Sequence, residues 1–432
     1  MGACSRWMRS RPSLHEARPS RGARHVISSG PDRTAVLRAA ERIRDGIVAT
    51  PCTRTRAFGD IVPCSFHLKF ENLQRTGSFK DRGSLNRLLQ LSADERARGV
   101  ITASAGNHGQ GLAYHGGRLG IPVTVVMPVT APLNKVTNTR GYGATVVLNG
   151  SVLDESAEEA ARIAAERNLV TVPAFDHPDI IAGQGTIGLE VLEQVPGVDT
   201  VLVPVGGGGL ISGICIAIKE VRPDVRVIGI EADAAASAKA SRVAGRVVQI
   251  AHSDTLADGI ATKRIGELTF PIIERYVDDL VSVGEAEIAA AILLLLEREK
   301  TVVEGAGAVP LAALRSGALS LDPDATVVAV LSGGNIDINM ISRIIDRGLV
   351  FDGRAARLAV KVRDRPGSLA ALTRTVADMG ANVLETYHRR AYADISLGDV
   401  EIVIQMETRG REHVEEIIRA LERLGHVVEE DH

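Results

Sequence analysis

The sequence has little cysteine, no long apolar run and no excess of charge of either sign. Its formal net charge at pH 7 is −3, and a chain without a basic field is not expected to bind nucleic acid. Chemistry on a small molecule is therefore the default. Four cysteines in 432 residues do not form a disulfide framework, and their spacing shows no metal-type pairing; they are Cys4, Cys52, Cys64 and Cys215. A reducing, cytoplasmic compartment fits best.

The longest apolar stretch without a charge, near residues 288–296, is about half as long as a membrane span. It ends in the charged residues 297–300 and predicts a buried helix, so no membrane partner is expected. Hydrophobic residues make up 45% of the chain and charged residues 24%, which is a globular balance. The length suffices for two or three domains, each with its own core.

The first 33 residues carry seven arginines and only two acids. This composition cannot bury enough surface to order itself, so we predict a disordered tail over residues 1–33. An arginine-rich, acid-poor start also resembles an organellar transit peptide, but no clear amphipathic helix is visible. From Thr34 onward, apolar residues recur at helical spacing and predict a helix before the break at Thr50 and Pro51.

Short apolar strands alternate with helical patterns through most of the chain. Strands are expected at residues 66–70, 100–102, 122–127, 144–148, 200–204, 225–230 and 326–331. The alternation implies crossover connections and parallel sheets covered by helices. We therefore expect an α/β fold with two open lobes over residues 34–346, the smaller lobe being inserted at about 66–150. The cleft between them should lie at the carboxyl ends of the strands.

The character of the chain changes after Arg347. Residues 347–356 read as a linker, and residues 357–432 read as a βαββαβ module of the ferredoxin-like kind. Its expected elements are strands at 358–362, 382–389 and 400–406, helices ending near Met379 and spanning 412–424, and a short final strand.

Lys80 is a candidate nucleophile. It follows the turn Thr76-Gly77-Ser78 and opens a helical segment, so its amine should sit at a helix start. Burial and the positive helix end both disfavour the ammonium form, and a neutral amine is what forms a Schiff base with an aldehyde. The alternative is an ordinary solvated lysine, which is the usual state of this residue type.

Four consecutive glycines follow the strand expected at 200–204: Gly206, Gly207, Gly208 and Gly209. Glycines let backbone N–H groups approach an anion closely, and the helix that follows adds positive potential, so we predict a phosphate cradle. A tight turn and a dinucleotide site are the alternatives. The dinucleotide pattern needs a glycine where Ile211 stands, although Glu231 could imitate its ribose-binding acid. A monophosphate is therefore favoured.

These motifs resemble one known family. The run Thr76-Gly77-Ser78-Phe79-Lys80 with Arg82-Gly83 is similar to the lysine motif of the fold-type II pyridoxal-phosphate enzymes, in particular the threonine dehydratases. Further motifs follow in the family's order: Ser104 to Gly109, Gly206 to Gly209, Leu256 to Gly259, Val303 to Gly307 and Leu331 to Asn335. The resemblance spans about residues 35–345 and implies pyridoxal 5'-phosphate as cofactor.

The resemblance also implies roles for single residues. Lys80 would carry the cofactor, Asn107 would contact the 3-oxygen of its ring, and Ser332 would hydrogen-bond the ring nitrogen. A serine hydroxyl cannot supply a counter-charge to that nitrogen, so the ring is a weaker electron sink than with an aspartate. Ser332 could also be a helix N-cap. Phe79, Gly259 and Glu304 are expected to line the cofactor site.

The substrate carboxylate would bind at a helix start, held by Ser104, Gly106, Asn107 and His108. His108 could equally be a packing residue. Ala105 stands where related serine racemases carry a serine that protonates the α-carbon, which favours dehydration over racemisation. The metal site of some relatives needs an acid where this chain has Ser237, so no metal is expected.

Dehydration and deamination of L-threonine and L-serine is thus the expected reaction, in isoleucine biosynthesis or threonine catabolism. The alternatives are another fold-type II reaction, such as racemisation or β-replacement, and a non-catalytic amino-acid sensor. The C-terminal module, which has Asp364-Arg365-Pro366-Gly367 at its first helix, resembles an ACT domain. The resemblance implies an amino-acid effector bound near Gly367 and Asn382 in a homo-oligomer; a purely dimerising module is the alternative.

Overall fold

The computed structural model describes residues 30–390, 396 and 398–431. Most of the arginine-rich tail predicted over residues 1–33 therefore lies outside the described residues. The first described helix is α1 (Arg33–Ile43), whose N-cap Asp32 accepts a hydrogen bond from the amide of Ala35 at 2.8 Å. This helix lies where the spacing of apolar residues predicted one, although it ends well before Pro51.

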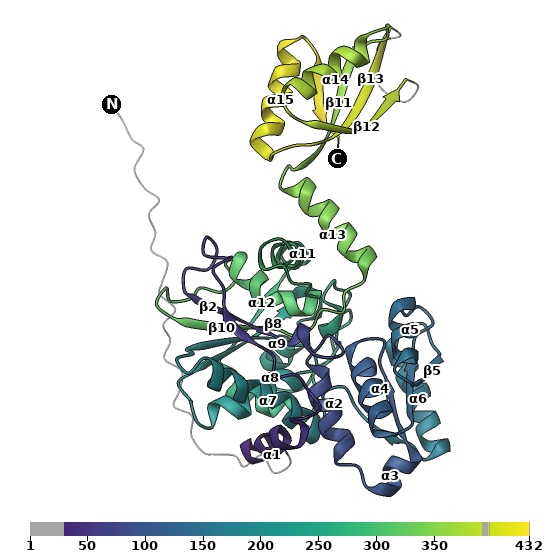
Figure 1. The fold of residues 1–432 in the computed structure, drawn as a ribbon, viewed down its shortest axis with the longest axis vertical. Helices are drawn as coiled ribbons and strands as arrows, with labels where there is room; N and C mark the ends of the chain where they lie inside the picture. The colour runs from purple at the N-terminus through teal and green to yellow at the C-terminus, as the bar shows by residue number, and fades with distance from the viewer. Residues whose placement is uncertain (1–29, 391–395, 397, 432) are drawn as a thin grey trace.

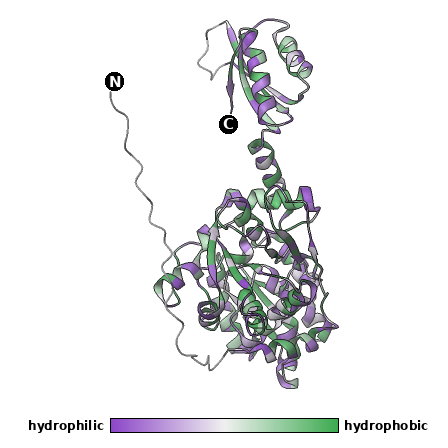
Figure 2. Cartoon of the chain, turned by 90° about the vertical axis from the view of Figure 1, so that its left-hand side faces the viewer, coloured by the Kyte–Doolittle hydropathy of each residue, from purple (hydrophilic) through white to green (hydrophobic). Residues whose placement is uncertain are grey.

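The larger of the two lobes, here called the large lobe, is built on a six-stranded sheet in the order β1-β2-β10-β7-β8-β9. Only the edge strand β1 is antiparallel to its neighbour. The strands are β1 (Cys52–Arg54), β2 (Ser65–Phe70), β7 (Thr200–Pro204), β8 (Arg226–Ala232), β9 (Asp279–Val283) and β10 (Thr326–Leu331). Continuous apolar runs such as β7 and β10 are buried on both faces, and in Figure 2 the strands inside this body are mainly hydrophobic.

The second lobe, the small lobe, is a parallel sheet in the order β5-β4-β3-β6. Its strands are β3 (Val100–Ala103), β4 (Val123–Met127), β5 (Thr145–Leu148) and β6 (Val170–Thr171). The expectation that the small lobe begins at about residue 66 is wrong, because β2 pairs with β10 in the large lobe. The small lobe also extends past residue 150 to include β6. An apolar strand does not reveal from its own residues which sheet it joins.

Helices cover both sheets (Figure 1). Those of the small lobe are α3 (Ala93–Arg98), α4 (Asn107–Leu119), α5 (Leu133–Gly141) and α6 (Leu153–Arg167). Those around the large lobe are α1, α2 (Lys80–Leu89), α7 (Pro178–Gln194), α8 (Gly209–Lys219), α9 (Ser237–Ala244), α10 (Thr269–Tyr276), α11 (Glu285–Leu294) and α12 (Gly305–Arg315). Short 3-10 turns occur at η1 (Glu71–Leu73), η2 (Asp233–Ala235) and η3 (Asp258–Ile260), and α11 continues into a π-helical turn, η4 (Leu295–Glu299).

Helix α13 (Ile338–Phe351) leads away from the large lobe to a separate C-terminal module (Figure 1). It overlaps the start of the segment predicted to be a linker, 347–356, so the first part of that segment is helical. Ile344 is the buried residue of this helix, while Phe351 at its end is 72% exposed. The helix therefore packs on the large lobe through Ile344, whereas its last residue is exposed.

The C-terminal module has the predicted βαββαβ order. Its elements are β11 (Ala355–Arg363), α14 (Ser368–Asp378), β12 (Asn382–Arg389), β13 (Asp399–Glu407), α15 (Arg411–Arg423) and β14 (Val427–Glu430). The strands form an antiparallel sheet in the order β12-β13-β11-β14, which is the ferredoxin-like arrangement. Leu358, Val376, Ile404 and Ile417 belong to a hydrophobic core that is separate from those of the two lobes.

Candidate active site

A cavity of about 440 Å³ lies between the large and small lobes, next to the carboxyl ends of β3, β7 and β10. All the residues of the two lobes that were predicted to bind cofactor or substrate line it: Phe79, Lys80, Ser104, Gly106, Asn107, His108, Gly206, Gly207, Gly208, Gly209, Gly259, Glu304 and Ser332. The fold therefore gathers chemically distinct groups that are far apart in sequence, as expected where helix amino-termini converge.

Lys80 is the first residue of α2, and its side chain reaches into this cavity. Its Nζ donates a hydrogen bond of 2.9 Å to the carbonyl oxygen of Ala174 and lies 4.8 Å from the centre of the Phe79 ring. Burial lowers the pKa of Lys80 to about 8, against the opposing attraction of the Glu304 carboxylate. Near neutral pH roughly a tenth of this amine is therefore unprotonated and nucleophilic, far more than for a lysine with the ordinary pKa. An ordinary solvated lysine does not describe this residue.

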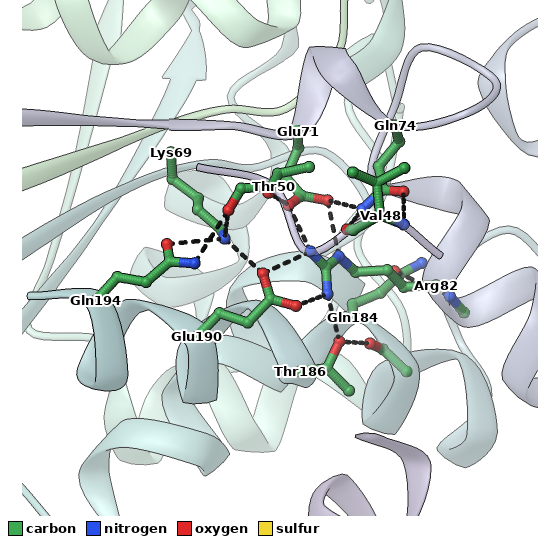
Figure 3. Close-up of polar contacts among 12 residues, drawn as sticks. Val48, Thr50, Lys69, Glu71, Gln74, Arg82, Gln184, Thr186, Glu190 and Gln194 are labelled. Carbon is green, nitrogen blue, oxygen red and sulfur yellow. Dashed lines mark hydrogen bonds and ion pairs between the residues drawn. The ribbon is translucent and has the colours of Figure 1, made fainter. Parts of the chain in front are cut away.

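The helix that carries Lys80 is held by a buried ionic network (Figure 3). Arg82, two residues further on, donates to both carboxylate oxygens of Glu71 at 2.8 and 2.7 Å and to both oxygens of Glu190 at 2.5 and 2.8 Å. Lys69 donates a third hydrogen bond to Glu190 at 2.5 Å and one to the carbonyl oxygen of Thr50 at 2.6 Å. Burial alone would raise the pKa of Glu71, but the charge and hydrogen bonds of Arg82, the charge of Lys69 and the hydrogen bond from Thr50 together hold this pKa below its usual value.

This network contains two cations and two carboxylates, so its formal charge is balanced. Glu71 belongs to η1 and Glu190 to α7, which means that Arg82 ties the first turn of α2 to two other elements of the chain. A bidentate guanidinium fixes direction as well as distance. The position of the Lys80 amine is therefore set by groups that do not themselves line the cavity.

The four glycines form the turn between β7 and α8, and α8 begins at Gly209. A Cβ atom on Gly207 would lie 2.3 Å from the Phe175 ring, and one on Gly206 would lie 2.9 Å from the Cα of Ile260. Gly208 has φ of +90°, a conformation that side chains other than glycine rarely adopt. The turn thus needs glycine for close approach, and its amides at a helix start suit a phosphate group.

The dinucleotide alternative does not fit this turn. Ile211 is fully buried in the hydrophobic core, and the carboxylate of Glu231 accepts hydrogen bonds from the amides of Ala238 and Lys239 at 2.7 and 2.9 Å. Glu231 therefore caps the start of α9 and is not presented to a ribose. A cradle for one phosphate, a nucleophilic amine and a hydroxyl at the end of β10 together fit pyridoxal phosphate.

Ser332 directly follows β10 and is 2% exposed. Its carbonyl oxygen accepts a hydrogen bond from the amide of Phe79 at 3.0 Å, so it sits beside the lysine segment. The interpretation of Ser332 as a helix N-cap is wrong, because the next helix, α13, starts at Ile338 and is capped by Asp337. Its hydroxyl belongs to the cavity wall instead.

Asn107 opens α4 and is held at both ends of its amide group. Its Nδ2 donates to Glu304 at 2.7 Å, and its Oδ1 accepts from the side chain of Asn335 at 2.7 Å. Burial raises the pKa of Glu304 to about 7, and the nearby Asp258 carboxylate adds to the rise. A proton on Glu304 near neutral pH lets this carboxyl either donate or accept a hydrogen bond. Asn335 was quoted only as part of a motif, and its contact with Asn107 was not foreseen.

The predicted carboxylate loop is held in shape by its own serine. The Ser104 hydroxyl accepts hydrogen bonds from the amides of Gly106 and Gly109, at 3.3 and 3.1 Å. His108 contacts the carbonyl oxygen of Val172 at 3.0 Å through Nε2, and burial together with the nearby Lys80 charge lowers its pKa to about 3. His108 is therefore neutral at physiological pH and suited to packing, not to acid–base chemistry.

Some cavity residues were missed by sequence reasoning. Lys135 of α5 and Asp258 of η3 form an ion pair of 2.5 Å, and Phe175 packs under the glycine turn. Asp258 belongs to the motif Leu256 to Gly259, but Lys135 and Phe175 lie in segments with no motif. Only the fold brings them to the site.

The predicted effector residues lie in the C-terminal module, outside this cavity. Gly367 has φ of +93° and immediately precedes α14. The Asn382 side chain, at the start of β12, donates to the Glu407 carboxylate at 2.9 Å. Near the foot of the module, Arg354 pairs with Glu297 of η4 at 2.5 Å, which joins the module to the large lobe.

No site in the described part of the chain gathers three or more His, Cys, Asp or Glu side chains that could hold a metal ion. Ser237, on which the expectation of no metal depended, is fully buried. In the same described residues, no helix combines the length and hydropathy needed to span a bilayer.

Two family models match the chain. One, described as pyridoxal-phosphate dependent enzyme, matches residues 43–333, and the other, described as ACT domain, matches residues 356–426. The first match covers more than half of the sequence. The chain therefore belongs to the pyridoxal-phosphate-dependent enzymes, with the fold-type II architecture and a C-terminal ACT domain, and pyridoxal phosphate is its cofactor.

More specific likenesses point to one branch of that family. The chain is 48% identical over 394 residues to an L-threonine ammonia-lyase of Thermotoga maritima, covering 91% of this chain and 98% of the relative. It is 43% identical to a catabolic L-threonine dehydratase of Escherichia coli, with 72% of this chain and 94% of the relative covered. The processed form of threonine deaminase isoform 2 from Solanum lycopersicum has a similar structure, with a TM-score of 0.69, 35% identity, and 74% and 94% of the two chains covered. Maize serine racemase also has a similar structure, with a TM-score of 0.70 and 31% identity, and the match covers 74% of this chain and 99% of the racemase.

Proposed function

We propose that the protein is an L-threonine ammonia-lyase, which converts L-threonine to 2-oxobutanoate and ammonia and L-serine to pyruvate and ammonia. The observation that carries this proposal is the Lys80 amine, kept partly unprotonated in a cavity that also holds the glycine cradle. The likeness to the L-threonine ammonia-lyase of Thermotoga maritima supports the choice of substrate.

When bound, pyridoxal phosphate supplies the electron-withdrawing ring that makes loss of the substrate α-proton possible. Gly206 to Gly209 would hold its phosphate, Asn107 and Ser332 would contact its ring, and Phe79, Gly259 and Glu304 would line its site. The Ser332 hydroxyl cannot counter a positive ring nitrogen, which favours rapid loss of the β-hydroxyl. Lys80 as free amine would take the α-proton, since its pKa of about 8 suits a base near neutral pH.

The loop from Ser104 to His108 would bind the substrate carboxylate through backbone amides at the start of α4. The β-hydroxyl leaves with a proton as water, and hydrolysis of the released enamine consumes one water and yields the keto acid and ammonia. Racemisation needs a proton donor on the opposite face of the α-carbon. Ala105 lines the cavity with a methyl group and offers none, which argues against the activity in the name of the maize relative.

Replacing Lys80 by alanine tests this proposal. The variant should lose the cofactor's visible absorption band and its keto-acid release from threonine and serine, because the amine both carries the cofactor and moves the proton. Lys239→Ala, a lysine of α9 outside the cavity, is the matched control and should keep both. Turnover by the Lys80→Ala variant, or D-serine as the main product from L-serine, would contradict the proposal. A cofactor band without any keto acid in the unmodified protein would favour the sensor alternative.

We also propose that an amino acid such as isoleucine or valine binds the C-terminal module near Gly367 and Asn382 and changes activity. Glycine with φ of +93° before α14 leaves backbone amides free of a side chain, which suits a carboxylate. A homo-oligomer in the cytoplasm and a role in isoleucine biosynthesis or threonine catabolism complete the proposal.

A further inference from the structure

Among the described residues, two ion pairs between a lysine and a carboxylate join the small lobe to the large lobe. In one, Lys135 of α5 meets Asp258 of η3 at 2.5 Å; in the other, Asp154 of α6 meets Lys263 at 3.0 Å. The two pairs differ in their surroundings. Lys135 and Asp258 both line the active-site cavity, and their side chains are 10% and 54% exposed. Asp154 and Lys263 lie outside the cavity, and their side chains are 66% and 37% exposed.

Asp258 belongs to the turn η3, which packs tightly against residues on the cofactor side of the cavity. A Cβ atom on Gly259 would lie 2.9 Å from the Cβ of Ala306 and 3.1 Å from a carboxylate oxygen of Glu304. The next residue, Ile260, lies against Gly206 of the phosphate cradle. The turn thus has no room to shift without disturbing the cradle and Glu304, so Asp258 is a fixed point of the large lobe.

Lys135 stands on the opposite side of the cavity, in the lobe that carries the predicted carboxylate loop. Helix α5 follows β4, which pairs with β3, and the loop starting at Ser104 directly follows β3. The Lys135 side chain is 10% exposed, so its ammonium has given up most of its water. A cation in that position needs a partner, and Asp258 supplies it across the cleft.

We propose that Lys135 is a positioning residue that pairs with Asp258 to hold the small lobe closed over a bound amino-acid substrate. The inference rests on the proposed function. Closure would bring the loop from Ser104 to His108 against the substrate carboxylate, while the cradle stays still. Asp154 and Lys263 should not perform this task, because both side chains are exposed and neither lines the cavity, and a pair of two exposed charges contributes little.

One other role for Lys135 makes an opposite prediction. If its ammonium bound the substrate carboxylate directly, Asp258 would compete for it, and removing the charge of Asp258 would tighten substrate binding. If the pair holds the lobes closed, removing either partner lowers the fraction of protein in the closed state. The apparent affinity for the substrate then falls with that fraction. The direction of the Asp258→Asn effect therefore separates the two roles.

The experiment compares Lys135→Met, Lys135→Arg and Asp258→Asn with the control variants Lys263→Met and Asp154→Asn, all as full-length enzyme with cofactor. We expect KM for threonine to rise about tenfold in Lys135→Met and in Asp258→Asn, with kcat within about threefold of the parent. Lys135→Arg should restore KM, and the controls should leave KM and kcat unchanged. The double variant Lys135→Met/Asp258→Asn should raise KM no more than either single variant does.

Hydrogen exchange of the α5 backbone amides gives a readout that does not depend on turnover. Exchange should be faster in Lys135→Met than in the parent and unchanged in Lys263→Met. A lower KM in Asp258→Asn, an unchanged KM in Lys135→Met, or an equal effect in the control pair would overturn the inference. Failure of the proposed function would look different, since the parent enzyme itself would then release no keto acid.

Discussion

At the scale of single residues, the site depends on a lysine that the fold makes harder to protonate. An unfolded chain exposes Lys80 to water, where its pKa has the ordinary value of 10.5, whereas burial in the folded protein lowers it to about 8. Between these two values the unfolded state binds a proton that the folded state does not. Stability linked to this group must therefore rise as pH increases from about 8 to about 10.5.

This linkage predicts how a neutral side chain at position 80 behaves in the cofactor-free protein. Lys80→Met should raise the melting temperature by a few degrees at pH 7, because it removes the cost of an ammonium held in the cavity. The difference should shrink as pH approaches 10, where the native lysine is already neutral. Thermal unfolding followed by circular dichroism at several pH values checks this. A gap that is constant with pH would mean that the effect comes from packing and not from charge.

Site residues that belong to a recognisable local motif could be predicted from the sequence. Site residues that reach the cavity only through the tertiary fold could not. Lys80 and the run from Gly206 to Gly209 stand out because a lysine after Thr-Gly-Ser and four glycines after an apolar strand are locally unusual. Lys135 and Phe175 look like any lysine and any phenylalanine, since their roles arise only across the cleft. Which roles the predicted residues play stays a prediction until the variants are measured.

At the scale of elements, helix α2 is positioned by charges buried beneath it. Arg82 meets two carboxylates, and neither Arg82 nor Glu71 is exposed. Breaking such a pair leaves an uncompensated charge in a low dielectric, which is far more costly than losing a surface pair. The position of Lys80 therefore depends on an intact ionic network, although no member of that network lines the cavity.

Arg82→Met should therefore destabilise the protein by about 3 to 5 kcal/mol and weaken cofactor retention. Arg162 of α6 offers a matched control, because it also pairs with two carboxylates, Glu159 and Glu166, but is 55% exposed. Arg162→Met should cost about 0 to 1 kcal/mol. Urea unfolding measures both. Comparable losses for the two arginines would show that burial does not set the strength of the Arg82 network.

Element boundaries followed the sequence closely where turns or glycines flank a strand, and less closely elsewhere. Strands β7 and β10 and strand β12 have the predicted bounds, because turns or glycines flank each of them. The membership of β2 in the large lobe and the helical character of residues 347–351 were not foreseen. The first depends on long-range strand pairing, and the second on a helix that continues past its buried part. Neither can be recognised from the local spacing of apolar residues.

At the scale of the whole molecule, the catalytic lobes and the C-terminal module are separate packed units joined by α13. The module has its own hydrophobic core, and Arg354, directly before its first strand, pairs with Glu297 of the π-helical turn η4. That turn precedes Glu304 by a few residues, and Asn72 of η1 fastens the intervening Thr301 by a side-chain hydrogen bond of 2.8 Å. A contiguous path of contacts thus runs from the module to Glu304, which hydrogen-bonds Asn107.

Deleting residues 354–432 should consequently leave threonine turnover close to that of the full chain while removing any response to isoleucine or valine. The lobes keep all the residues that line the cavity, since none of them lies beyond Ser332. A typical coupling of about 1 to 3 kcal/mol corresponds to a change in apparent affinity of about 5- to 150-fold, which steady-state assays with and without each amino acid resolve easily. Equal inhibition of the truncated enzyme would place the effector site within the catalytic lobes.

If the contact between Arg354 and Glu297 transmits the response, Arg354→Gln in the full chain should reduce the response of threonine turnover to the amino acid. The variant should still bind the effector, which calorimetry measures.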